Sequence, residues 1–185
     1  MYREINGNLI TLGQQNTFDV IAHGVNCFCI QGAGLAPQMV DAFSTDKFPM
    51  EAKPFIGEIN KLGTVEYRWI DLQTGEHFAK PDKNHTLCVV NAYTQFDLGR
   101  NHKAGKPIPV DYEALALCMR KMNYLFKGMK VGLPQIGAGL AGGDWKRIKK
   151  IIQEELVDCD VTVVIYDNSK ILTNETQGNN YSQSI

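Results

Sequence analysis

The sequence has few of the features that mark membrane, secreted or nucleic-acid-binding proteins. No stretch approaches the roughly 18 consecutive apolar residues of a membrane-spanning helix. The opening residues lack the basic segment and apolar run of a secretory signal. The 19 Lys and Arg nearly balance the 20 Asp and Glu, which leaves a net charge of −1. We therefore expect no membrane association and no strong nucleic-acid binding.

Cysteine is sparse and irregularly placed. The Cys27-x-Cys29 spacing is too short for the usual zinc motifs, and no Cys-x-x-Cys pair or group of histidines completes a metal site. The odd total of five cysteines also argues against a disulfide framework. This pattern favours a reducing cytoplasm and predicts neither a metal nor another cofactor.

The composition is that of an ordinary globular domain. The chain has 185 residues, of which 44% are hydrophobic and 21% charged, and this length suits a single core. We expect one domain over residues 1–172. Residues 173–185 have little to bury and predict a polar tail.

Apolar runs of strand length alternate with helical patterns. Runs rich in β-branched and aromatic residues predict strands at residues 8–12, 19–25, 64–70, 87–93, 129–133 and 161–166, with a further short strand considered at residues 2–5. Apolar residues at helical spacing predict one helix that Asp111 begins as N-cap and another from Trp145 to Leu156. Near-continuous apolar strands alternating with such helices predict a three-layer α/β/α sandwich with a largely parallel sheet.

Two glycine-rich segments follow predicted strands and precede helices. They are loop 1, QGAGLA at residues 31–36, and loop 2, GAGLAGG at residues 137–143. Such junctions expose backbone N–H groups and let a phosphate approach the main chain closely. Two of them could clamp a diphosphate, whereas the simpler alternative is that the glycines only form tight turns or close helix packing. A dinucleotide-binding fold is disfavoured, because only 43 residues follow the GxGxxG match at residues 137–142.

Four segments together resemble macro domains. They are GNLIT at residues 7–11, VIAHGVNCFCIQGAGLA at 20–36, VVNAYTQ at 89–95 and LPQIGAGLAGGDW at 133–145. The third resembles the branch that includes ADP-ribose-1″-phosphate phosphatases and terminal ADP-ribosyl-glutamate hydrolases. The resemblance implies a macro domain with a mixed, mostly parallel sheet of about six strands and an ADP-ribose pocket at its crest.

The resemblance also implies roles for individual residues. Asn8 stands where the family has an acidic residue that accepts from the adenine amino group, and the Leu9 backbone and the Tyr166 ring would complete the adenine site. Asn26 matches the asparagine that contacts the distal ribose. The first phosphate loop is matched by Gly32, Ala33, Gly34 and Leu35, and the second by Ile136, Gly137, Ala138, Gly139 and Leu140.

Three catalytic positions of related hydrolases carry other residues here. Ala36 replaces a catalytic Asp, Gln95 replaces a Lys, and Ala141 replaces an Asp that directly follows the Gly-x-Gly-Leu of loop 2. These departures argue against removal of ADP-ribose from protein or DNA by the known routes. Asp144 either caps the helix that follows it or serves in the site.

His23 precedes the residues expected at the distal ribose. It is either a core histidine satisfied by a hydrogen bond or a catalytic acid or base. With His23 as the catalytic residue, the sequence predicts hydrolysis of ADP-ribose 1″-phosphate to ADP-ribose and phosphate. The alternatives are a non-catalytic reader of ADP-ribose, and a de-ADP-ribosylating or deacylating hydrolase with atypical catalytic residues. Oligomeric state and physiological substrate are left open.

Overall fold

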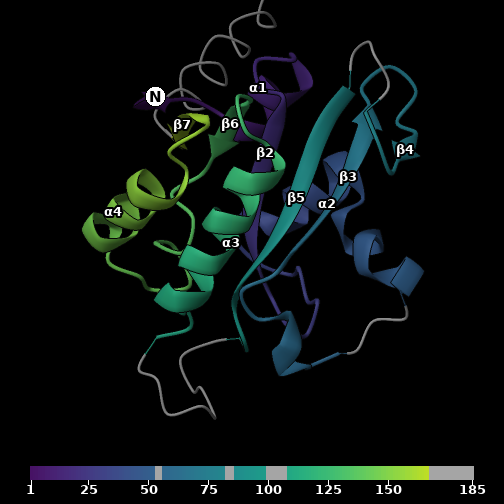
Figure 1. Ribbon diagram of the computed structural model, residues 1–185. Coiled ribbons are helices and arrows are strands. Elements are labelled where there is room, and N and C mark those ends of the chain that lie inside the picture. Colours follow the sequence, from purple (N-terminus) through teal and green to yellow (C-terminus); the bar gives the residue numbers. More distant parts are fainter. Residues whose placement is uncertain (53–55, 82–85, 99–107, 167–185) are drawn as a thin grey trace, which may run out of the picture.

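A seven-stranded mixed sheet forms the centre of the computed structural model, which describes residues 1–52, 56–81, 86–98 and 108–166 (Figure 1). The strand order is β1-β7-β6-β2-β5-β3-β4. Strands β1, β7, β6, β2 and β5 are parallel, β3 is antiparallel to β5, and β4 is antiparallel to β3. The strands are β1 Tyr2–Asn6, β2 Val20–Asn26, β3 Val65–Asp71, β4 His77–Phe78, β5 Thr86–Gln95, β6 Lys130–Leu133 and β7 Asp160–Ile165.

Helices cover both faces of this sheet. They are α1 Leu9–Gln14, α2 Ala36–Phe43, α3 Tyr112–Leu125 and α4 Trp145–Glu155, with the 3₁₀ helices η1 Thr45–Ala52 and η2 Ile59–Lys61. Side chains of α3 and α4 share one core with alternate strand residues, and side chains of α1, α2 and η1 share the other. Neighbouring residues therefore face opposite layers: Val20 packs with α3 and α4, whereas Ile21 packs with α1 and α2. The predicted α/β/α sandwich is confirmed, with seven strands rather than about six.

The two helices predicted from apolar spacing are also confirmed. Asp111 caps α3 by accepting hydrogen bonds from the N–H groups of Glu113 and Ala114. Asp144 caps α4 by accepting from the N–H of Lys146 at 2.9 Å. Both carboxylates lie at helix N-termini, where the unpaired N–H groups and the helix dipole favour an acceptor.

The prediction of a strand at residues 8–12 is wrong, because this segment begins helix α1. The side-chain oxygen of Asn8 accepts from the N–H groups of Ile10 and Thr11, at 2.9 and 3.1 Å. Leu9, Ile10 and Gly13 are the buried residues of this helix, at the i, i+1, i+4 spacing of a helical face. The predicted opening strand at residues 2–5 is correct and forms β1.

The predicted domain boundary and tail concern residues that the structure does not describe, whereas membrane spans and cysteines can be examined in the described residues. The boundary at residue 172 and the tail at residues 173–185 lie outside the described residues. Within the described chain, no helix is both long enough and apolar enough to cross a membrane. All five cysteines are free, and four of them are buried.

Candidate ligand-binding site

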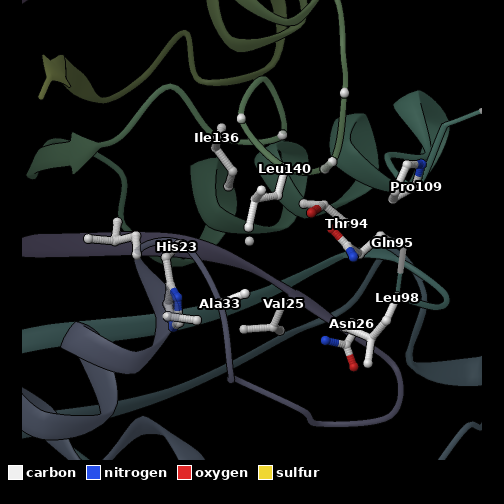
Figure 2. A pocket seen from close by; sticks show the side chains of 18 of the residues that line it. His23, Val25, Asn26, Ala33, Thr94, Gln95, Leu98, Pro109, Ile136 and Leu140 are labelled. Atoms are coloured by element: carbon white, nitrogen blue, oxygen red, sulfur yellow. The ribbon is translucent and has the colours of Figure 1, made fainter. Parts of the chain in front are cut away.

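A cavity of about 1170 Å³ opens at the carboxyl ends of β2, β5 and β6 (Figure 2). These strands are neighbours and parallel, so their following loops meet at one edge of the sheet, where α/β proteins commonly bind ligands. The lining comes from the end of β2, loop 1, the end of β5 and loop 2. It consists of residues 23–26, 30, 32–36, 94, 95, 98, 108, 109, 134–137 and 139–142.

The side chain of Asn26 organises the turn that leads into loop 1. Its amide nitrogen donates to the carbonyl of Ile30 at 2.6 Å, and its oxygen accepts from the N–H groups of Phe28 and Ile30. Asn26 is buried at the edge of the cavity. The sequence predicted a ribose contact for this residue, and its amide has one further N–H available for such a contact.

Loop 1 exposes its backbone to the cavity. Gly34 has φ +67°, a left-handed conformation that glycine adopts without strain. A Cβ placed on Gly32 would meet no atom within 4 Å, so the main chain there is open to an approaching group. Among the described residues, the N–H groups of Gly32 and Ala33 have no backbone acceptor. The loop can therefore offer donors to an anion, and its role in phosphate binding stays a prediction.

Loop 2 combines a packed base with an open tip. A Cβ on Gly143 would lie 2.7 Å from the carbonyl oxygen of Gly137 and 2.7 Å from Ile148 Cδ1, so this glycine is required for packing. Gly139 at the tip has open space around its Cβ position. Within the described part of the chain, its N–H and that of Leu140 have no backbone acceptor. Loop 2 thus uses its glycines both for close helix packing and for exposure to the cavity.

His23 lies in the sheet beneath the two loops, with only 2% of its surface exposed. One ring nitrogen, Nε2, lies 2.7 Å from Oδ1 of Asn91, and the other, Nδ1, has no hydrogen-bond partner among the described residues. Burial lowers the pKa of His23 to about 4, and the hydrogen bond to Asn91 opposes that shift. His23 is therefore neutral at pH 7 and cannot supply a proton as an imidazolium.

Thr94 is a cavity residue that sequence reasoning did not select as part of the site. Its side chain is 1% exposed and its Oγ1 has no hydrogen-bond partner within the described residues. A Cβ on Gly24 of the adjacent strand would lie 2.8 Å from this oxygen, so only glycine leaves room for it. The available signal was the position of Thr94 at the end of a strand that leads into the crest.

Ten of the predicted residues line the cavity, and four do not: Asn8, Leu9, Ala138 and Tyr166. Asn8 is the cap of α1 and Leu9 is buried in that helix. Tyr166 is half exposed and follows β7. Because β1 and β7 are parallel to β2, Asn8 and Tyr166 lie at the same edge of the sheet as the cavity. Their roles toward adenine stay predictions.

The cavity wall carries little charge. Of the described residues that line it, His23 alone has a titratable side chain. Ala36, Gln95 and Ala141, where related hydrolases carry catalytic residues, all line the cavity. The amide nitrogen of Gln95 donates to the carbonyl of Asp97 at 2.9 Å. Asp144 does not line the cavity and acts as the helix cap described above.

The fold is similar to that of solved macrodomains. The structure of the Thermus aquaticus DarG macrodomain is similar, with a TM-score of 0.60 and 21% sequence identity. The match covers 90% of this chain and 98% of the DarG macrodomain chain. Thermosipho africanus DarTG, solved in complex with ADP-ribose, matches 90% of this chain and 41% of its own, with a TM-score of 0.60 and 15% identity. The protein described here thus has the macrodomain fold.

A curated relative comes from a bacteriophage. It is an uncharacterized 17.5 kDa protein from the tk-vs intergenic region of Enterobacteria phage T4. The two are 29% identical over an alignment of 155 positions, which covers 80% of this chain and 86% of the relative. No family model matches the chain.

Proposed function

We propose that the protein binds ADP-ribose or a derivative of it in the cavity between loops 1 and 2. The observation that carries this proposal is the pair of glycine loops, which expose backbone N–H groups to one cavity from two sides. Each loop alone is a common turn, but two loops whose N–H groups lack a backbone acceptor in the described part of the chain suit a diphosphate. The ADP-ribose complex of the similarly folded DarTG supports the same ligand.

The order of the strands suggests how ADP-ribose would be oriented along this edge of the sheet. The diphosphate would lie between Gly32 of loop 1 and Gly139 of loop 2. The distal ribose would then face the ends of β2 and β5, and the adenine would extend toward Asn8 and Tyr166. Neighbouring strands are about 4.8 Å apart, and β7 is two strands from β2, so an extended ADP-ribose would span both regions.

We further propose that the bound derivative is ADP-ribose 1″-phosphate and that the protein hydrolyses it. A water molecule would attack the phosphorus and lose a proton to His23, and the bond between phosphorus and the 1″-oxygen would break. The departing 1″-oxygen would take up a proton from solvent while His23 returns its own to solvent, so that ADP-ribose and phosphate leave. The unpartnered Nδ1 of His23 supports this reaction, because its lone pair could accept a proton from the water. With a pKa of about 4, His23 would be a weak base, so positioning by the loops would contribute most of the rate.

Calorimetric titration tests the proposed binding of ADP-ribose, and turnover assays test the proposed hydrolysis of ADP-ribose 1″-phosphate. ADP-ribose should bind more tightly than AMP, which lacks the second phosphate and the distal ribose, and absence of binding would contradict the whole proposal. Purified protein with ADP-ribose 1″-phosphate should release phosphate above a buffer control. Binding without any phosphate release would contradict the hydrolase and leave a reader of ADP-ribose. Turnover of acylated or protein-linked ADP-ribose instead would assign a different hydrolase.

A further inference from the structure

A chain of buried hydrogen bonds leads from His23 to loop 1. His23 and Asn91 are directly paired in the register of the parallel strands β2 and β5, and their side chains meet at 2.7 Å. The amide nitrogen of Asn91 donates to the backbone carbonyl of Thr45 at 2.9 Å. The hydroxyl of Thr45 in turn donates to Oε1 of Gln31, the first residue of loop 1, at 2.6 Å. His23, Asn91 and Thr45 are each at most 2% exposed.

The direction of these bonds determines which nitrogen of His23 carries the proton. A backbone carbonyl can only accept, so the group of Asn91 that faces Thr45 must be its NH₂. The oxygen of Asn91 then faces His23, and because this oxygen also can only accept, Nε2 of His23 must donate. A neutral imidazole has one N–H, so Nδ1 is unprotonated.

This tautomer leaves an acceptor without a donor. Nδ1 is buried and unpartnered in the part of the chain that the structure describes, although His23 lines the cavity. An unsatisfied buried polar atom costs roughly 1–3 kcal/mol, and such atoms often mark a functional site. A ligand that brings a hydroxyl donor would satisfy this atom.

We propose that Asn91 is a positioning residue that holds His23 in the Nε2–H tautomer. In the ADP-ribose complex, which has no 1″-phosphate to hydrolyse, the one lone pair of Nδ1 then accepts a hydrogen bond from a distal-ribose hydroxyl instead of a proton from water. The ligand part of this inference rests on the proposed function. The tautomer part concerns the free protein and stands independently. The backbone carbonyl of Thr45 orients Asn91, whereas the Thr45 hydroxyl connects to loop 1 and is not needed for the tautomer.

Nitrogen-15 NMR of the histidine rings in the full chain tests both parts. The His23 signals are assigned by their loss in His23→Gln, and the two-bond ring correlations identify the protonated nitrogen. At pH 7 we expect a proton on Nε2 and none on Nδ1. Saturating ADP-ribose should shift the Nδ1 resonance as that atom accepts a hydrogen bond. Saturating ADP, which has the diphosphate but no distal ribose, should leave it in place.

Variants separate positioning from a general structural effect. Asn91→Leu removes the acceptor and should give a mixture of tautomers, whereas Asn91→Gln keeps both an amide oxygen and an NH₂ group and should retain the Nε2–H form. Thr45→Val retains the backbone carbonyl and should retain the tautomer. Asn91→Leu should also weaken ADP-ribose binding roughly 3- to 10-fold with little effect on ADP, the size expected for one hydrogen bond. The matched control is Thr162→Val. Thr162 is buried outside the cavity, and its hydroxyl has no hydrogen-bond partner among the residues that the structure describes.

Several results would overturn the inference. A proton on Nδ1 in the wild type, or an unchanged tautomer in a folded Asn91→Leu variant, would remove the positioning role. Equal Nδ1 shifts with ADP and ADP-ribose would remove the ribose contact. Absence of ADP-ribose binding would overturn the proposed function and the ligand part together, and the tautomer of the free protein would still decide the positioning part. If Asn91→Leu does not fold, the wild-type spectra still test the tautomer and the ribose contact.

Discussion

A Cβ atom placed on Gly34 would lie 3.3 Å from Cδ1 of Leu140, so loops 1 and 2 meet at the cavity even though they are about a hundred residues apart in sequence. Leu140 is 73% exposed and contributes little to the core. In Figure 2 its side chain lies at the cavity together with those of Ile136 and Thr94. A large apolar side chain that is exposed in this position suits a cover for a bound ligand better than a part of the hydrophobic core.

Trimming Leu140 tests this cover. Leu140→Ala should change the free energy of unfolding by less than about 0.5 kcal/mol, since the side chain is largely in solvent. The same change should weaken ADP-ribose binding about 2- to 5-fold, because a partly buried leucine contributes on the order of 0.5–1 kcal/mol of apolar contact. Leu117→Ala removes an exposed leucine on α3 and serves as the control for calorimetric titration. Equal affinities in the two variants would exclude the cover.

The two glycines of loop 2 should respond differently to substitution. Gly139 has open space at its Cβ position and no positive φ, so Gly139→Val should fold normally and weaken ADP-ribose binding tenfold or more by blocking the main chain. Gly137 has φ +76°, and a Cβ there would lie 2.9 Å from Val110 Cγ2. Gly137→Val should therefore lower the melting temperature as well. Thermal melting separates the two effects, and a Gly139→Val protein with wild-type affinity would remove loop 2 from the site.

Asn8 caps helix α1, so a test of its predicted adenine contact must separate the effect on binding from the effect on stability. Asn8→Asp and Asn8→Ser both keep a cap acceptor for α1 and should keep the stability of the wild type. Asn8→Leu removes the cap and should cost about 0.5–2 kcal/mol in unfolding free energy. If Asn8 recognises adenine, Asn8→Leu should also discriminate less between ADP-ribose and its hypoxanthine analogue. Unchanged discrimination, measured by competition at a temperature where the variant is folded, would place the adenine elsewhere.

Local patterns predicted the layers of this fold but could not resolve the short segment after β1. The five residues from Asn8 to Leu12 are too few to show a helical period, and an apolar run of this length suits either a strand or a helix. In the structure the N–H groups of Ile10 and Thr11 donate to the Asn8 side chain, which caps the helix and favours it over a strand. Asn8 was therefore recognised as a polar residue of interest, but its capping role was not.

The cavity was predictable where loops carry glycine and unpredictable where distant segments meet. Loops 1 and 2 follow strands in sequence, so their glycines could be read directly. The contact between His23 and Asn91 depends on the register of β2 and β5, which the sequence alone does not give. Pro109 lines the cavity because the next residue, Val110, bridges to Gln95 at the end of β5. No local sequence motif predicts the pairing of Val110 with Gln95.

Burial of a neutral His23 makes the stability of the fold depend on pH. Its pKa is about 4 in the folded protein against about 6.5 in an unfolded chain. The unfolded state therefore binds a proton first, and the stabilisation is complete above pH 6.5 and lost as the pH falls toward 4. Between pH 7 and pH 5 the wild type should lose about 1–2 kcal/mol more unfolding free energy than His23→Gln.

Urea unfolding at the two pH values measures this difference. His77→Gln is measured in parallel as a change at an exposed histidine outside the cavity, on the short strand β4. Parallel pH dependence in the wild type and His23→Gln would mean that His23 titrates near its ordinary pKa in the folded protein.

The pairing of β1 with β7 has a consequence for how the chain folds during synthesis. β1 lies at the edge of the sheet, and its one neighbouring strand is β7, with Tyr2 opposite Val161. The amino group of Met1 donates to the carbonyl of Cys159 at 3.0 Å. β1 is therefore made long before the strand that it pairs with, and closing so long a loop is slow. Until β7 emerges, the half of the crest where β1 and β7 end does not exist, while β2 and β5 can already pair.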